Sequence, residues 1–203
     1  MGLLLDIAAL WVPSFILWRE LEGVARRTAA ALDDLLEACA PRALPQVRLE
    51  DTPPAGSLAQ RRAAMARAHN RRVTALAAAL GQEEAVRRGR AVLFPLGLQI
   101  GREVRSRLRV GDSAGDLLRA ARVIYRVLGI RFTVRWSGDR QGVLRVHRCA
   151  LAEHYSDVTC AVLSAVDEGV VRGLNPRAGM VFRDHIPGGA TECSAHLEIT
   201  REG

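Results

Sequence analysis

The 203-residue sequence contains no lysine, few aromatic residues and only four cysteines. Its 29 basic side chains are therefore all arginines, and because this holds along the whole chain we read no function into it. There is no Gly-rich phosphate loop and no dinucleotide-binding fingerprint, so nothing indicates a nucleotide cofactor. The start lacks a basic region and a small-residue cleavage site. We therefore expect reduced thiols in a cytoplasmic protein rather than a disulfide framework.

The basic charge is concentrated in the first three quarters of the chain, with a net charge of +11 over residues 1–148 and −4 over residues 149–203. The most basic stretch, SLAQRRAAMARAHNRRVTALAAAL, has its apolar residues in one helical stripe and Arg67 and Arg71 opposite. This pattern is typical of an amphipathic helix with a solvated basic face. Since no aromatic residue is interleaved there for base stacking, we predict no nucleic-acid partner.

The chain begins with an apolar run, MGLLLDIAALWVPSFILW, which Asp6 and Pro13 interrupt. The run is short for a bilayer-spanning helix. We expect it to form an apolar helix buried against the domain or against a partner subunit, which leaves a homo-oligomer open. The alternative is weak membrane contact of residues 3–18 through Trp11, Phe15 and Trp18.

The periodicity of the sequence predicts an α+β fold, in which a helical N-terminal half precedes a ββαββ antiparallel sheet with helices packed on one face. Helices are expected from about residue 14 to Cys39, from Ser57 to Gly81, and on each side of Pro95, where one helix should end. At residue 130 the period changes from 3.6 to 2. The linker LPQVRLEDTPPAGS would separate an N-terminal segment, residues 1–50, from a single α+β domain, residues 57–203.

Cys160 is the first candidate for a reactive group. Asp157 is expected to cap a helix, which would place Cys160 in its first turn. The unpaired N–H groups and the helix dipole there favour a thiolate. Asp167, seven residues further on, would share the same helical face. The alternative interpretation is a small buried thiol beside a surface acid.

Two further cysteines lie on predicted strands. Side chains alternate between the two faces of a β-strand, which places Cys149 on the same face as His147 and Arg145. This face is either part of a functional site or exposed to solvent. Cys193 shares its face with apolar residues and is expected to be a core thiol. We predict that Cys149, Cys160 and Cys193 line one pocket, with Cys39 apart. The three thiols suit zinc, but their spacing matches no standard zinc motif, so we expect no metal and keep zinc as an alternative.

The order of these motifs resembles that of a known family. A strand ending in HRC, the helix VTCAVLSAVDEGVVRGLNP, the strand MVFRDH and the turn IPGGATEC resemble the L-2-amino-thiazoline-4-carboxylic acid hydrolase family over roughly residues 95–199. The resemblance implies hydrolytic opening of a small cyclic amidine at a cysteine-centred site. Cys160 would be the nucleophile, with Cys149 as a second catalytic thiol that could attack instead. Asp167 or His147 would transfer protons. Arg145 would bind a substrate carboxylate, and Cys193 would also contact the substrate.

A second resemblance is to small-molecule-binding domains related to the vinyl-reductase type. It implies a non-catalytic binding or sensor module with a thiol-lined pocket. In both interpretations the partner is a small molecule, and Cys149 and Cys193 lie in the same pocket as Cys160.

Overall fold

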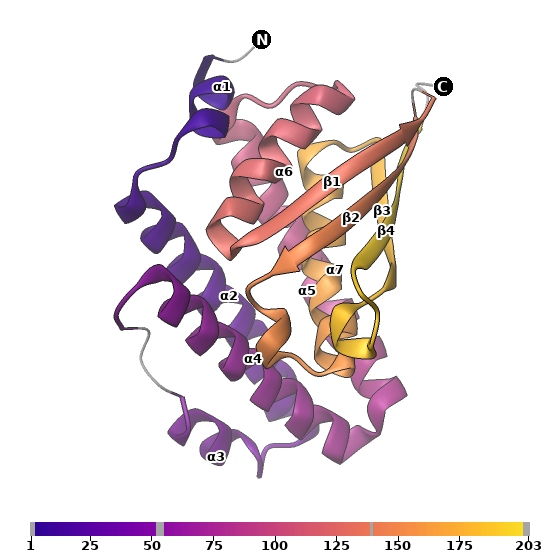
Figure 1. The fold of residues 1–203 in the computed structure, drawn as a ribbon. Coiled ribbons are helices and arrows are strands. Elements are labelled where there is room, and N and C mark those ends of the chain that lie inside the picture. The colour runs from indigo at the N-terminus through magenta and orange to yellow at the C-terminus, as the bar shows by residue number, and fades with distance from the viewer. Residues whose placement is uncertain (1–2, 52–54, 139, 201–203) are drawn as a thin grey trace.

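The computed structural model describes residues 3–51, 55–138 and 140–200, and it confirms the predicted α+β class (Figure 1). A helical first half is followed by a four-stranded antiparallel sheet made of two hairpins, and one long helix connects the hairpins along the chain. The elements are α1 Leu3–Leu10, α2 Ser14–Cys39, α3 Leu44–Leu49, α4 Leu58–Leu80, α5 Gln82–Leu108, α6 Ala114–Leu128, β1 Ile130–Ser137, β2 Gln141–Cys149, the 3-10 turn Ala152–His154, α7 Asp157–Leu174, β3 Ala178–Asp184, the 3-10 turn Ile186–Gly188, and β4 Cys193–Ile199.

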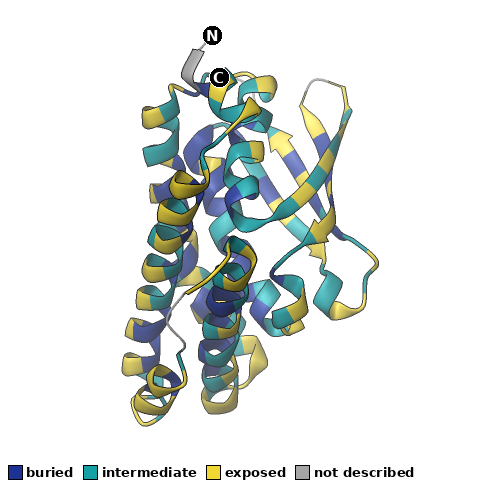
Figure 2. Cartoon of the chain, turned by 60° about the vertical axis from the view of Figure 1, so that its left-hand side comes forward, coloured by how far each residue is buried: buried dark blue, intermediate teal, exposed yellow. Residues whose placement is uncertain are grey.

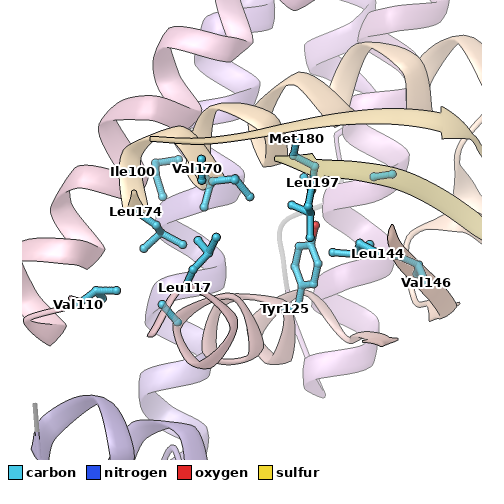
Figure 3. Close-up of a cluster of buried hydrophobic side chains, with 14 of the residues drawn as sticks. Ile100, Val110, Leu117, Tyr125, Leu144, Val146, Val170, Leu174, Met180 and Leu197 are labelled. Carbon is cyan, nitrogen blue, oxygen red and sulfur yellow. The ribbon is translucent and has the colours of Figure 1, made fainter. Parts of the chain in front are cut away.

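The sheet has the order β1-β2-β4-β3, and its helices cover one face, as predicted (Figure 1). Alternate residues such as Leu144, Val146 and Leu197 are buried against α5, α6 and α7, whereas the residues between them are exposed. Figure 3 shows Tyr125 of α6 beside Leu144 and Leu197 of the sheet. The main core therefore lies between the sheet and these helices.

Local signals in the sequence set several helix ends. The Ser57 hydroxyl accepts a hydrogen bond from the Gln60 N–H, and the Gln60 side chain accepts one from the Ser57 N–H at 2.7 Å, which is the expected capping box. Gly129, with φ of 73°, ends α6 in the left-handed conformation that favours glycine.

Pro95 does not end a helix, contrary to the prediction, but lies inside the single helix α5. Proline removes one backbone donor, yet α5 is held along its length by close packing on α7. A Cβ atom at Gly97 would collide with the backbone carbonyl of Val166. Four glycines of the two helices make such backbone-to-backbone contacts: Gly97, Gly101, Gly169 and Gly173.

Arg67 of α4 is exposed, as its place on the basic face predicted, but other arginines of this helix are partly or fully buried. Arg72 is 2% exposed and pairs with Asp33 of α2 and with Asp51, each at 2.7 Å. Arg62 donates to the carbonyl groups of Arg126 and Val127 at the end of α6. These arginines connect α4 to other helices. Figure 2 shows the buried residues along the inward sides of the helices.

The predicted apolar helix at the start of the chain is broken at residues 11–13 into α1 and the beginning of α2. Leu5 and Leu17 are buried as expected, but several other apolar side chains of this region are exposed. Figure 1 shows α1 beside α6. Within the described residues, no helix has both the length and the apolar character needed to span a membrane.

Candidate functional site

A cavity of about 80 Å³ lies between the sheet, α4, α6 and α7, and three thiols line it. Cys149 comes from the end of β2, Cys160 from the start of α7 and Cys193 from the start of β4. Cys39 lies elsewhere, where its sulfur accepts a hydrogen bond from Arg88 at 3.2 Å. The predicted convergence of the three thiols, with Cys39 apart, is confirmed.

Cys149 reaches the cavity because of a β-bulge. The pairing of β2 with β1 passes from Val146 directly to Arg148 and skips His147. His147 and Arg148 are consequently both exposed, and Cys149 returns to the inner face. The prediction that Cys149 shares a face with His147 and Arg145 is therefore wrong, because the bulge interrupts the period of two.

His147 and Arg145 lie on the outer face of the sheet. Arg145 donates to Glu192 at 2.8 Å, and His147 Nδ1 lies 3.3 Å from the other carboxylate oxygen of Glu192. His147 Nε2 is 2.8 Å from the Thr133 hydroxyl. The sequence-predicted roles of His147 in proton transfer and of Arg145 in carboxylate binding thus have no geometry to support them in this cavity.

The start of α7 differs in detail from the prediction. Ser156, not Asp157, is the N-cap, and its hydroxyl accepts a hydrogen bond from the Thr159 N–H at 3.2 Å. The Cys160 N–H donates to the Ser156 carbonyl at 2.9 Å, so it belongs to the regular helical ladder. Cys160 consequently lies one residue further into the helix than expected.

Cys160 and Cys193 form a hydrogen-bonded pair of thiols. Cys160 donates to Cys193, and this bond lowers the pKa of Cys193 to about 7, against the opposing effect of burial. The Ile186 N–H also donates to the Cys193 sulfur, at 3.3 Å. The same bond, followed by burial, raises the pKa of Cys160. The raised pKa of Cys160 gives no support to the predicted thiolate at this position, and the hydrogen bonds to the Cys193 sulfur favour a thiolate there instead.

Asp167 lines the cavity together with Cys160, as their spacing predicted. Burial, reinforced by the charge of Glu168, raises the pKa of Asp167 to about 7, although a hydrogen bond from the Tyr125 hydroxyl favours its ionised form. Burial likewise raises the pKa of Cys149 to about 11. At neutral pH the carboxyl group of Asp167 is therefore protonated in part of the molecules and ionised in the rest.

The buried histidine of this site was not predicted from the sequence. His69 is 2% exposed and lines the cavity, with Nε2 2.7 Å from the Thr28 hydroxyl and Nδ1 2.8 Å from the Tyr155 hydroxyl. Burial lowers the pKa of His69 to about 3, so the ring is neutral. Its spacing of four residues from both Met65 and Val73 was the available signal, since it places His69 on the apolar face of α4.

A larger groove, of about 650 Å³, adjoins the thiol-lined cavity. It is bounded by α1, α2, α5, α6 and α7 and is mostly apolar, with Ile7, Trp11 and Phe15 at the N-terminal side. The two spaces share part of their lining, so they lie next to each other in the molecule. The shared residues are Val24, Leu128, Val166 and Asp167.

The arrangement of the three thiols bears on the zinc alternative. Over residues 3–51, 55–138 and 140–200, no group of three or more His, Cys, Asp or Glu side chains is arranged to hold a metal ion.

Comparison with known proteins yields structural neighbours only. No protein-family model and no curated protein matches the chain. A trafficking protein particle complex subunit 3 from Naegleria fowleri, solved covalently bound to palmitic acid, is 12% identical with a TM-score of 0.56, over 69% of this chain and 95% of that chain. An H-NOX protein from S. oneidensis, solved in the Fe(II)NO state, is 14% identical with a TM-score of 0.44, over 86% of this chain and 98% of that one. The first likeness shows a shared fold alone, and the second is too weak to show even that. Neither protein is a thiazoline hydrolase, so the hydrolase activity suggested by the sequence motifs stays a prediction.

Proposed function

We propose that this chain is a small-molecule-binding module whose ligand has a long apolar part and a small polar head group. The observation that carries the proposal is the shared lining of the two spaces. The apolar groove and the thiol-lined cavity share Asp167 and three apolar residues in their lining, so a ligand whose chain lies in the groove would place its head group near Asp167, on the side of the thiols. A volume of about 650 Å³ is in the range of ligand-binding pockets.

An acyl chain is the ligand class that fits this lining best. The groove wall consists mainly of aliphatic and aromatic side chains, which favour a hydrocarbon chain over a polar molecule. The trafficking protein subunit of similar fold was solved with palmitic acid bound covalently, which supports the same ligand class here.

Asp167 would make the binding of the ligand's head group depend on pH. Below about pH 7 its carboxyl is protonated and can donate a hydrogen bond to a carboxylate or carbonyl oxygen. Above that pH its negative charge repels a carboxylate. Binding of a fatty acid should therefore weaken as the pH rises through 7.

Titration calorimetry with decanoate on the purified chain tests the proposal. Val24→Phe narrows the junction of the two spaces and should weaken binding about tenfold or more, since it displaces part of the buried chain. Val181→Phe, the same change at an exposed residue of the sheet, is the matched control and should leave the affinity unchanged. If calorimetry detects no decanoate binding and decanoate does not raise the Tm of the protein, the proposal fails.

We keep a second candidate function, hydrolysis of a cyclic amidine, because Cys193 and Asp167 both have pKa values of about 7 in one cavity. A thiolate nucleophile and a group that exchanges protons near neutral pH are the two components that such a reaction requires. The hydrogen-bonded thiols Cys160 and Cys193 are the alternative nucleophiles.

Mass spectrometry of 2-amino-thiazoline-4-carboxylate incubated with the protein tests this candidate. Ring opening by the wild type, abolished in Cys160→Ser or in Cys193→Ser, would support it and identify the nucleophile. If the wild type leaves the ring intact, the hydrolase proposal fails and the binding proposal is unaffected.

A further inference from the structure

The exposed apolar side chains of this protein are concentrated at one place. Of the nine large apolar side chains that are exposed among the described residues, six lie within residues 7–18. Trp11 and Phe15 are each 67% exposed, and Leu10 is 84% exposed. We call these six residues the N-terminal apolar surface: Ile7, Leu10, Trp11, Phe15, Ile16 and Trp18.

The N-terminal apolar surface forms the rim of the large groove. Ile7, Trp11 and Phe15 are exposed and at the same time line the groove. They come from α1, from the break after it and from the first turn of α2, which lie together at one edge of the molecule (Figure 1). A ligand that enters the groove from this side passes across these side chains.

The surface is held in place by contacts made inside the molecule. Arg126 of α6 donates to the Ala9 carbonyl at 2.7 Å, and Asp6 lies 3.5 Å from Arg119. Leu5 is 1% exposed and packs in the main core. Because α1 is tied to α6 on its inner side, its outer apolar side chains stay presented to the solvent.

Two arginines lie beside the apolar side chains, and exposed Glu22 lies one turn after Trp18. Arg19 is exposed at the groove, and the Arg61 guanidinium lies 5.2 Å from the centroid of the Trp18 ring. Glu20, which also lines the groove, is neutralised by Arg107 at 2.8 Å. Tryptophan rings beside arginines are suited to a membrane–water interface, because the rings prefer the boundary and the guanidinium groups attract anionic head groups.

We propose that the N-terminal apolar surface docks on an anionic lipid bilayer and that the groove takes up its acyl ligand directly from that bilayer. Docking is peripheral, since the side chains that would enter the lipid belong to the outer sides of α1 and the first turns of α2. The groove opens within the docked surface, so an acyl chain can move from lipid to protein without exposure to water. Docking stands on the surface alone, whereas ligand uptake rests on the proposed function.

Co-sedimentation with vesicles tests the docking. The full chain should bind vesicles that contain phosphatidylglycerol and should bind pure phosphatidylcholine vesicles more weakly, and added salt should reduce the difference. The double variant Trp11→Ser/Phe15→Ser should lose about tenfold or more in partitioning, because each aromatic side chain contributes buried apolar area. Leu49→Ser/Val181→Ser also removes two exposed apolar side chains, which belong to α3 and β3 and not to the N-terminal apolar surface, and should bind like the wild type.

Three results would overturn the proposal. The first is that the wild type does not bind phosphatidylglycerol vesicles at low salt. The second is that both double variants lose binding equally. The third is that the wild type does not bind vesicles and is a dimer that Trp11→Ser/Phe15→Ser converts to a monomer, which would mean that a second copy covers the surface. Decanoate titration of the same proteins separates the two proposals. Vesicle binding without decanoate binding would support docking and contradict the ligand uptake.

Discussion

At the scale of single residues, the ionisation of the cavity depends on which groups share it. Cys193 is buried, yet its pKa is about 7, because the neighbouring Cys160 thiol and the Ile186 N–H donate hydrogen bonds to its sulfur. Asp167 shows the opposite balance, because burial outweighs the hydrogen bond from Tyr125 and raises its pKa. Both values follow from specific partners and can be changed by substituting those partners.

The acidity of Cys193 should depend on a donor at position 160. Cys160→Ala removes the thiol that donates to Cys193 and should raise the pKa of Cys193 toward its ordinary value. Alkylation of Cys193 by iodoacetamide at neutral pH should then slow about tenfold, because only the thiolate reacts. Cys160→Ser keeps a donor and should change this rate less. Peptide mass spectrometry measures the rates, with Cys39 as internal reference. Equal rates in the Ala and Ser variants would contradict the assignment.

The raised pKa of Asp167 should appear in the pH dependence of stability. The folded protein keeps this proton up to about pH 7, whereas the unfolded chain loses it near the ordinary value of 3.8. Between these pH values the folded state binds more protons, so the Asp167 contribution to stability falls as pH rises and is constant above pH 7. Asp167→Asn does not titrate and can still accept the Tyr125 hydrogen bond. Its free energy of unfolding should increase relative to wild type by about 1.4 kcal/mol per pH unit within this window.

Urea titrations at a series of pH values measure this difference. A difference between wild type and Asp167→Asn that is constant with pH would mean that Asp167 titrates at its ordinary value in the folded protein.

At the scale of the elements, the pairing of α5 with α7 decides how the site is built. Both helices bring glycines to their contact, so their backbones approach closely, and Pro95 is tolerated inside α5. α7 also presents Cys160 and Asp167 to the cavity, and α5 lines the groove. A change in the spacing of α5 and α7 would therefore alter the helix that carries two of the site residues.

Gly97→Ala should destabilise the protein although alanine favours helices. The new methyl group would collide with the Val166 carbonyl, and overpacking of this kind costs about 1–3 kcal/mol. Gly23→Ala is the matched control in α2, where the described residues leave open space around an added Cβ. That change should stabilise by up to about 1 kcal/mol. Urea unfolding followed by circular dichroism measures both. A stabilised Gly97→Ala protein would contradict the close packing.

At the scale of the whole molecule, the N-terminal helices share their core with the rest of the chain. Leu32 and Leu36 of α2 pack in one cluster with Leu76 of α4, Leu93 of α5 and Val162 of α7. The ion pairs of Arg72 join the same parts. The division predicted from the linker, residues 1–50 against residues 57–203, therefore falls between helices that are packed together.

Because the core is shared, the chain should unfold in one transition. Trp136→Phe leaves Trp11 and Trp18 as reporters of the N-terminal helices, and Trp11→Phe/Trp18→Phe leaves Trp136 as the reporter of β1. Urea midpoints from the fluorescence of the two variants should coincide with the midpoints from circular dichroism. Separate midpoints for the two sets of reporters would show that residues 1–50 unfold independently.

Local chemistry in the sequence was sufficient to predict the class of the fold. Hydrophobic periodicity predicted the two hairpins, and the Ser57 capping box and Gly129 marked the ends of two helices, because each depends on neighbours within one or two turns. The alternation of apolar residues also assigned Cys193 to the inner face, and the seven-residue spacing put Asp167 beside Cys160 in the cavity lining. These features need no knowledge of distant contacts.

The chemistry of the site was decided only by the tertiary structure. A bulge that depends on pairing with β1 turned Cys149 inward and left His147 outside. The contact of Cys160 with Cys193 raises the pKa of Cys160 and lowers that of Cys193, and it joins residues that are far apart in the chain. The large groove is enclosed by five helices and has no motif of its own. The sequence determined which side chains were available and on which element each lies, whereas long-range packing determined which of them meet.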